Sequence, residues 1–145
     1  MDRKLTIQVV AMPSDANPDG DIFGGWILSQ MDLAAGVVAQ KEARCRVVTI
    51  AIDSMVFKNP VHVGDRICCY AEMIKVGTTS MKIKVEVWVT DKMTDDRRQV
   101  TEGLFTFVAI DENGKPQPVD RREAEAKKQA QRDLEQKRAE HGIVS

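Results

Sequence analysis

The sequence predicts an α+β fold in which one long helix is wrapped by an antiparallel sheet of five to six strands. Residues 21–40 follow a helical pattern, and Asp32 is the one charged side chain between Ile22 and Gln40. The remaining apolar segments alternate with a period of two and are joined by short turns. Short turns favour antiparallel neighbours, because parallel crossovers need about a dozen residues or more. One face of such a sheet can cover the helix.

The expected helix at residues 21–40 begins at a glycine pair, Gly24 and Gly25, after a loop rich in turn residues. On a helical wheel that starts at Ile27, the neighbours on the same side are Met31, Ala34, Ala35 and Val38. No face of the wheel is strongly charged, so we expect the helix to be buried nearly all round. A carboxylate in such a helix is costly unless it is paired, solvated in a cleft or used. Asp32 is therefore the first candidate for chemistry.

Five segments are expected to form strands because apolar and polar side chains alternate along them. They span residues 5–10, 47–57, 66–76, 80–90 and 100–110. The segment at 80–90 alternates most clearly, and one of its faces consists of Met81, Ile83, Val85, Val87 and Val89. Pro60 follows the second segment and cannot donate a hydrogen bond to a ladder.

The C-terminal part of the chain differs in composition. We expect a domain over residues 1–118 and a charged tail over residues 119–145 that is either helical or disordered. The apolar stripe of the tail is thin, consisting of Ala126, Ala130 and Leu134. The tail therefore either docks on the body or frays.

Composition excludes several classes of function. The formal net charge of −1 provides no basic field for nucleic acid, and no apolar run is long enough for membrane insertion. The start of the chain lacks the apolar core of a signal peptide. The three cysteines, Cys45, Cys68 and Cys69, form no disulfide framework and no Cys/His cluster. We expect buried thiols in a reducing cytoplasmic location, with no metal and no cofactor.

One stretch carries a family resemblance. From residue 12 the loop and helix start read MPSDANPDGDIFGGW, and SQMD follows at residues 29–32. This stretch closely resembles the YciA-type acyl-CoA thioesterases, which have the hotdog fold. The strands fit the same family through the segments AIDSMVF, VGD and KIKVEVWV. The resemblance covers residues 5–115 and leaves out the charged tail.

The resemblance implies hydrolysis of acyl-coenzyme A to a free acid and coenzyme A. It places the family's helix carboxylate at Asp32 and its loop asparagine at Asn17. It also implies double-hotdog dimers that assemble into a trimer of dimers, with active sites at the dimer interface. Pantetheine in this family lies along strand edges, and the residues expected to contact it are Phe57, Lys58, Gly77, Thr78 and Ser80.

Thioester hydrolysis needs an activated water or a nucleophile, and stabilisation of an oxyanion. Asp32 is suited to act as general base, or to attack the carbonyl and form a mixed anhydride, and both routes stay open. Gly24 and Gly25 would present unpaired backbone N–H groups at the positive end of the helix, where the thioester oxygen can be held. Asn17 would orient the water or the carbonyl.

Simpler interpretations exist for each of these residues. Asp32 can be an ordinary paired or solvated helix residue, and Asn17 an ordinary turn residue. The glycine pair can serve tight packing alone. The constellation of all four residues in one segment favours catalysis.

Two rival functions are weaker. A hotdog dehydratase needs a histidine close to the acidic helix, and neither His62 nor His141 is placed for that role. A non-catalytic protein that binds or senses acyl-CoA would want a DNA-binding appendage, and the mixed charge of the tail does not resemble a recognition helix. We therefore favour an acyl-CoA thioester hydrolase, with the sensor as the alternative.

Overall fold

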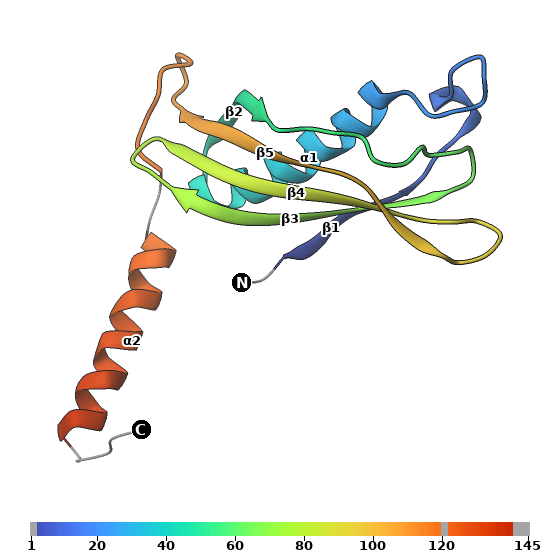
Figure 1. Cartoon of the computed structure of the whole chain (residues 1–145). Helices are drawn as coiled ribbons and strands as arrows, with labels where there is room; N and C mark the ends of the chain where they lie inside the picture. Colours follow the sequence, from blue (N-terminus) through green and yellow to red (C-terminus); the bar gives the residue numbers. More distant parts are fainter. Residues whose placement is uncertain (1–2, 120–121, 141–145) are drawn as a thin grey trace.

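The computed structural model describes residues 3–119 and 122–140, without the side chains of residues 122–128. Five antiparallel strands form one sheet in the order β1-β3-β4-β5-β2. A long helix, α1, lies against one face of the curved sheet (Figure 1). This is the hotdog arrangement that the sequence predicts. The elements are β1 (Lys4–Val10), a 3-10 helix (Pro13–Asp15), α1 (Gly24–Ala43), β2 (Arg46–Asp53), β3 (Arg66–Val76), β4 (Ser80–Thr90), β5 (Arg97–Ile110) and α2 (Arg122–Glu140).

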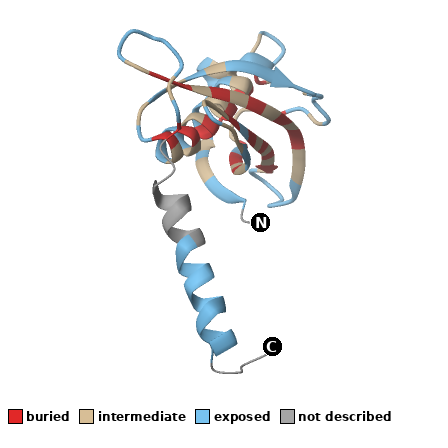
Figure 2. Cartoon of the chain, turned by 90° about the vertical axis from the view of Figure 1, so that its left-hand side faces the viewer, coloured by how far each residue is buried: buried red, intermediate tan, exposed pale blue. Residues whose placement is uncertain are grey.

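Small side chains let α1 approach the sheet closely. Its buried residues are Ile27, Met31, Ala34, Ala35, Ala39 and Ala43. The prediction that the helix is buried nearly all round is wrong for the single chain, because Leu33 is 58% exposed and Val37 is 54% exposed. The sheet is a single layer and covers one side of the helix only (Figure 2).

The core face of the sheet follows the predicted alternation. The five apolar residues expected on one face of β4 are all fully buried. Strands β3 and β4 have the predicted bounds, whereas β1 begins one residue earlier and β5 three residues earlier. Regular alternation over eleven residues fixes which face is inside, because a slip by one residue would expose every core side chain.

Strand β2 departs from the prediction because it ends at Asp53 instead of continuing to residue 57. Ser54 adopts a left-handed conformation with φ 58°, which turns the chain out of the ladder. The following segment crosses β5, where Thr101 Oγ1 donates to the Val56 carbonyl at 2.8 Å. Met55 occupies the space beside Gly103, where an added Cβ would lie 2.8 Å from the methionine Cγ.

Most apolar side chains of β2 face away from the core of the single chain, whereas Val47 packs against it. A bulge between Thr49 and Ala51 interrupts the pairing with β5. Val48, Ile50 and Ile52 are all exposed, and β2 forms one edge of the sheet. An exposed apolar edge strand is a template for pairing with another chain.

Helix α2 projects away from the sheet and α1 (Figure 1). Residues 129–140 are exposed, and side-chain hydrogen bonds within the helix accompany its regular turns, such as Gln129 to Asp133 at 2.8 Å. The last buried residue before α2 is Val119, whose N–H donates to the Thr78 carbonyl at 2.8 Å. The described residues contain no helix that is both long and apolar enough to cross a membrane.

We predict that removal of residues 121–145 leaves the domain folded. The described side chains of α2 are exposed and contribute little burial energy, and Val119 is retained. The melting temperature should shift by no more than about 2 °C, as expected for loss of exposed residues from a domain of this size. Insoluble protein after truncation would show that the tail stabilises the body.

Candidate active site

The predicted catalytic carboxylate lies in the middle of α1 and contacts β2. Asp32 is half buried, and its Oδ1 accepts a hydrogen bond from Thr49 Oγ1 at 2.6 Å. The two residues are 17 positions apart, so the contact depends on how α1 packs on the sheet. Within the described residues the second carboxylate oxygen has no hydrogen-bond partner. Thr49 therefore fixes one oxygen of Asp32 and leaves the other available.

The start of α1 carries unpaired donors, as predicted. Phe23 provides no side-chain cap, and its carbonyl accepts hydrogen bonds from Trp26 and Ile27 at 3.1 and 3.3 Å. Within the described part of the chain, the N–H groups of Gly24 and Gly25 have no acceptor. An added Cβ at Gly25 would meet nothing within 4 Å, so this side of the helix start is open.

Asn17 is a turn residue by geometry. Its Oδ1 accepts hydrogen bonds from the Asp19 and Asp21 backbone N–H groups at 2.9 and 3.0 Å. Its own backbone N–H donates to the Asp21 carbonyl at 2.7 Å. Since the side-chain oxygen already accepts two bonds, the free capacity of the carboxamide is the NH₂ group, which donates. A role for Asn17 in chemistry would therefore be that of a donor.

One chain does not bring all the predicted catalytic residues together. Gly24 and Asp32 are eight residues apart on the same helix, which corresponds to about 12 Å along its axis. Reacting atoms must approach to about 3–3.5 Å. A thioester oxygen held at Gly24 would therefore leave the carbonyl carbon out of reach of Asp32 in the same chain.

The residues predicted to contact substrate lie at two ends of the sheet. The Lys58 N–H donates to the Val100 carbonyl, and the Phe57 ring lies 3.6 Å from an added Cβ at Gly24. The turn with Gly77, Thr78 and Ser80 instead lies beside Val108, which pairs with Ser80. Val100 and Val108 are eight residues apart on β5, or about 26 Å.

A hollow of about 500 Å³ lies at the end of the sheet that carries the Gly77–Ser80 turn, but none of the predicted site residues lines it. It is lined by Cys45, Arg46, Ile110, Asp111, Glu112, Asn113 and Gln117. The Cys69 thiol offers no alternative nucleophile, because burial raises its pKa to about 12 and it stays protonated at neutral pH. The described residues contain no group of three or more side chains able to hold a metal ion.

The similarity to known proteins agrees with this fold. A family model described as the thioesterase superfamily matches residues 19–95. The acyl-CoA thioester hydrolase YciA of Escherichia coli (strain K12) is 47% identical over 118 residues, covering 79% of this chain and 89% of that protein. A hexameric thioesterase from Yersinia pestis superposes with a TM-score of 0.79 at 45% identity, covering 83% of this chain and 98% of that one.

A second solved structure is a hexameric broad-specificity acyl-coenzyme A thioesterase, in a variant with one aspartate replaced by alanine. It superposes with a TM-score of 0.79 at 48% identity, covering 82% of this chain and 88% of that one. The chain thus belongs to the thioesterase superfamily and, within it, to the YciA-type acyl-CoA thioester hydrolases. It is therefore a hydrolase, as the sequence predicts.

Thr49 is the site residue that sequence reasoning missed. The alternation of residues 47–57 places a hydroxyl on one strand face but does not show which part of the helix it meets. The available signal was a polar residue within an apolar strand that follows a helix in which residues 22–40 contain one carboxylate. Only the packing of α1 on the sheet brings Thr49 Oγ1 to 2.6 Å from Asp32 Oδ1.

We predict that Thr49→Val lowers turnover about tenfold, because a hydrogen bond to a charged group is worth about 1.5–3 kcal/mol. Valine has nearly the same shape, so the melting temperature should stay close to that of the parent. Steady-state kinetics and thermal unfolding check the two effects separately. An unchanged kcat would show that Asp32 needs no support from β2.

Proposed function

We propose that the protein hydrolyses acyl-coenzyme A thioesters to free carboxylic acids and coenzyme A. The observation that carries this proposal is the half-buried Asp32 carboxylate, of which one oxygen is held by Thr49 and the other has no hydrogen-bond partner among the described residues. The acyl-CoA thioester hydrolase names of the relatives support the substrate class. Acyl-chain length is left open.

Asp32 acts on water or on the thioester itself. In the first route its free oxygen takes a proton from water, whose oxygen attacks the thioester carbon and forms a tetrahedral intermediate. The intermediate collapses, the C–S bond breaks, and the departing thiolate takes up a proton. In the second route the free oxygen attacks the same carbon, the C–S bond breaks, and the departing thiolate takes up a proton, which leaves a mixed anhydride. Water then hydrolyses the anhydride, releasing the free acid and regenerating the Asp32 carboxylate. Thr49 orients the carboxylate in both.

The backbone N–H groups of Gly24 and Gly25 stabilise the developing oxyanion. They are unpaired donors at the positive end of α1, and the open space at Gly25 admits a substrate oxygen. The Asn17 NH₂ group provides a further donor, because its carboxamide oxygen is already used within the loop. Loss of one such donor costs about a hundredfold or more in other acyl-transfer sites.

Each active site takes residues from two subunits. The separation of about 12 Å along one helix prevents Asp32 from serving its own helix start. A second copy brings a second helix start and covers the apolar surface that the single chain exposes: Leu33, Val37, Val48, Ile50 and Ile52. Pairing of two β2 edges around a twofold axis gives two equivalent sites.

The larger assembly we propose is a trimer of these dimers, since both solved relatives described above are hexamers. Phe57 and Lys58 belong to the same end of the sheet as Gly24 and contact pantetheine from that side. Gly77, Thr78 and Ser80 lie about 26 Å away along the sheet and therefore contribute to the same site only from the other subunit.

We predict that Asp32→Asn lowers turnover by about a hundredfold or more, the usual cost of losing a general base, while coenzyme A binding persists. Release of free thiol from acetyl- to palmitoyl-CoA measures turnover. The control is Asp95→Asn in an exposed turn, where φ of 61° suits asparagine. Activity of Asp32→Asn within about threefold of the parent would refute Asp32 as the catalytic carboxylate, since acid–base groups normally contribute far more to the rate. A parent that binds substrate without releasing thiol would favour a sensor.

A second prediction concerns the shared site. Asn17→Ala and Asp32→Ala proteins, each nearly inactive, should regain activity when they are unfolded and refolded together. A mixed dimer would hold one doubly damaged site and one intact site if Asn17 and Asp32 come from different subunits. Mass spectrometry confirms the mixed dimers. No rescue in confirmed mixed dimers would place both residues in one subunit and refute the shared site.

A further inference from the structure

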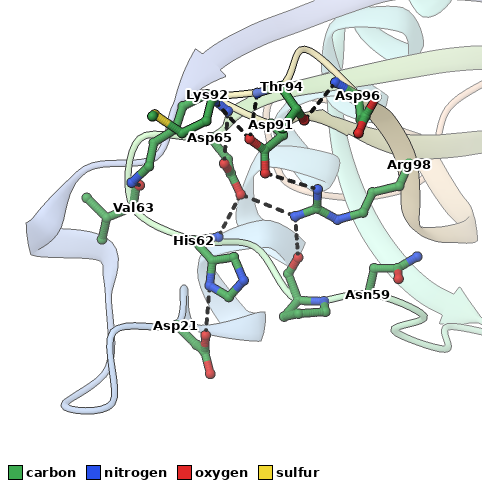
Figure 3. Close-up of polar contacts among 12 residues, drawn as sticks. Asp21, Asn59, His62, Val63, Asp65, Asp91, Lys92, Thr94, Asp96 and Arg98 are labelled. Atoms are coloured by element: carbon green, nitrogen blue, oxygen red, sulfur yellow. Dashed lines mark hydrogen bonds and ion pairs between the residues drawn. The ribbon is translucent and has the colours of Figure 1, made fainter.

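His62 lies beside the loop that carries Asn17 (Figure 3). Its Nδ1 is 3.0 Å from Asp21 Oδ1, and both side chains are about half exposed. The backbones meet at the same point, since the Ile22 N–H donates to the Val61 carbonyl at 2.9 Å. The imidazole therefore contacts Asp21, the residue at which the Asn17 loop joins the segment leading to α1.

Asp21 in turn holds Asn17. The Asp21 N–H donates to Asn17 Oδ1 at 3.0 Å, and the Asn17 N–H donates to the Asp21 carbonyl at 2.7 Å. Together with the bond from the Asp19 N–H to Asn17 Oδ1 at 2.9 Å, these bonds determine the orientation of the carboxamide and hence the direction of its free NH₂ group. A shift of Asp21 would turn that donor away from its position.

His62 is itself held from the opposite side by a buried network (Figure 3). Its backbone N–H donates to Asp65 Oδ2 at 3.0 Å, and Asp65 is only 1% exposed. Arg98 binds the same Asp65 oxygen at 3.3 Å, and the Lys92 N–H donates to the other oxygen at 3.4 Å. The charged groups around this network are Asp21, Asp65, Asp91, Lys92 and Arg98. His62 thus connects the network around Asp65 to the loop that carries Asn17.

We propose that His62 is a positioning residue for the reaction: through Asp21 it holds the Asn17 carboxamide in place. This inference rests on the proposed role of Asn17 as a donor to the substrate.

The test compares His62→Ala, His62→Asn and the parent. Asparagine places an uncharged N–H donor near the position of Nδ1, whereas alanine removes the donor. Hydrogen exchange of the Asp19 and Asp21 amides, measured in the free protein, reports on the bonds to Asn17 directly. Thiol release gives kcat and KM in parallel.

In His62→Ala, exchange at the Asp19 and Asp21 amides should be about twofold to fivefold faster, as expected for an exposed ion pair. The kcat should fall by a similar factor, with KM nearly unchanged. His62→Asn should restore both the exchange rates and the kcat, because it keeps an N–H donor near the position of Nδ1.

The matched control is Lys92→Met, which removes the 2.7 Å contact of Nζ with the Val63 carbonyl but leaves His62 and Asp21 in place. It should leave both readouts unchanged. Equal amide exchange in His62→Ala and the parent would overturn the inference. Failure of His62→Asn to restore kcat would overturn it too, as would faster exchange and a lower kcat in Lys92→Met. A parent without thioesterase activity would refute the proposed function instead, and the exchange rates would still test the contact.

Discussion

The packing of α1 against the concave face of the sheet fixes the positions of Asp32 and of the glycine pair. Ala34, Ala35 and Ala39 are fully buried and allow the helix backbone to approach the strands. Gly36 contributes to the same fit, since an added Cβ would lie 3.7 Å from the Phe107 ring. This approach brings Asp32 within hydrogen-bond distance of Thr49 and leaves the glycine pair at an open end.

The same packing leaves apolar surface uncovered. A single layer of sheet can bury only one side of a helix that has no strongly charged face, so Leu33 and Val37 stay exposed. The apolar residues of β2 are exposed next to an unpaired strand edge. A second copy of the chain would cover this apolar surface and would also complete the proposed active site.

The polar network of the protein lies in the loops around the start of α1 and not in the core, and it holds these loops in place. Asp65 is the most buried of these groups, and the bonds from His62, Lys92 and Arg98 compensate for the loss of water around its carboxylate. The loop that carries Asn17 is connected to this network through the contact between Asp21 and His62. The carboxamide donor that we propose for the reaction would thereby have the fixed orientation that a catalytic group needs.

The sequence alone determined the helix, the strands and the residue types available for chemistry. The alternation along β4 and the uncharged stretch around Asp32 are local patterns, so they were readable without a structure. Only the tertiary structure decided that Thr49 binds Asp32, that β2 ends at Asp53 and that Val48, Ile50 and Ile52 of β2 point outward. It also showed that Gly24 and Asp32 lie too far apart to serve one site in one chain. These features depend on register, a left-handed turn and the distance between elements, and residue periodicity does not encode them.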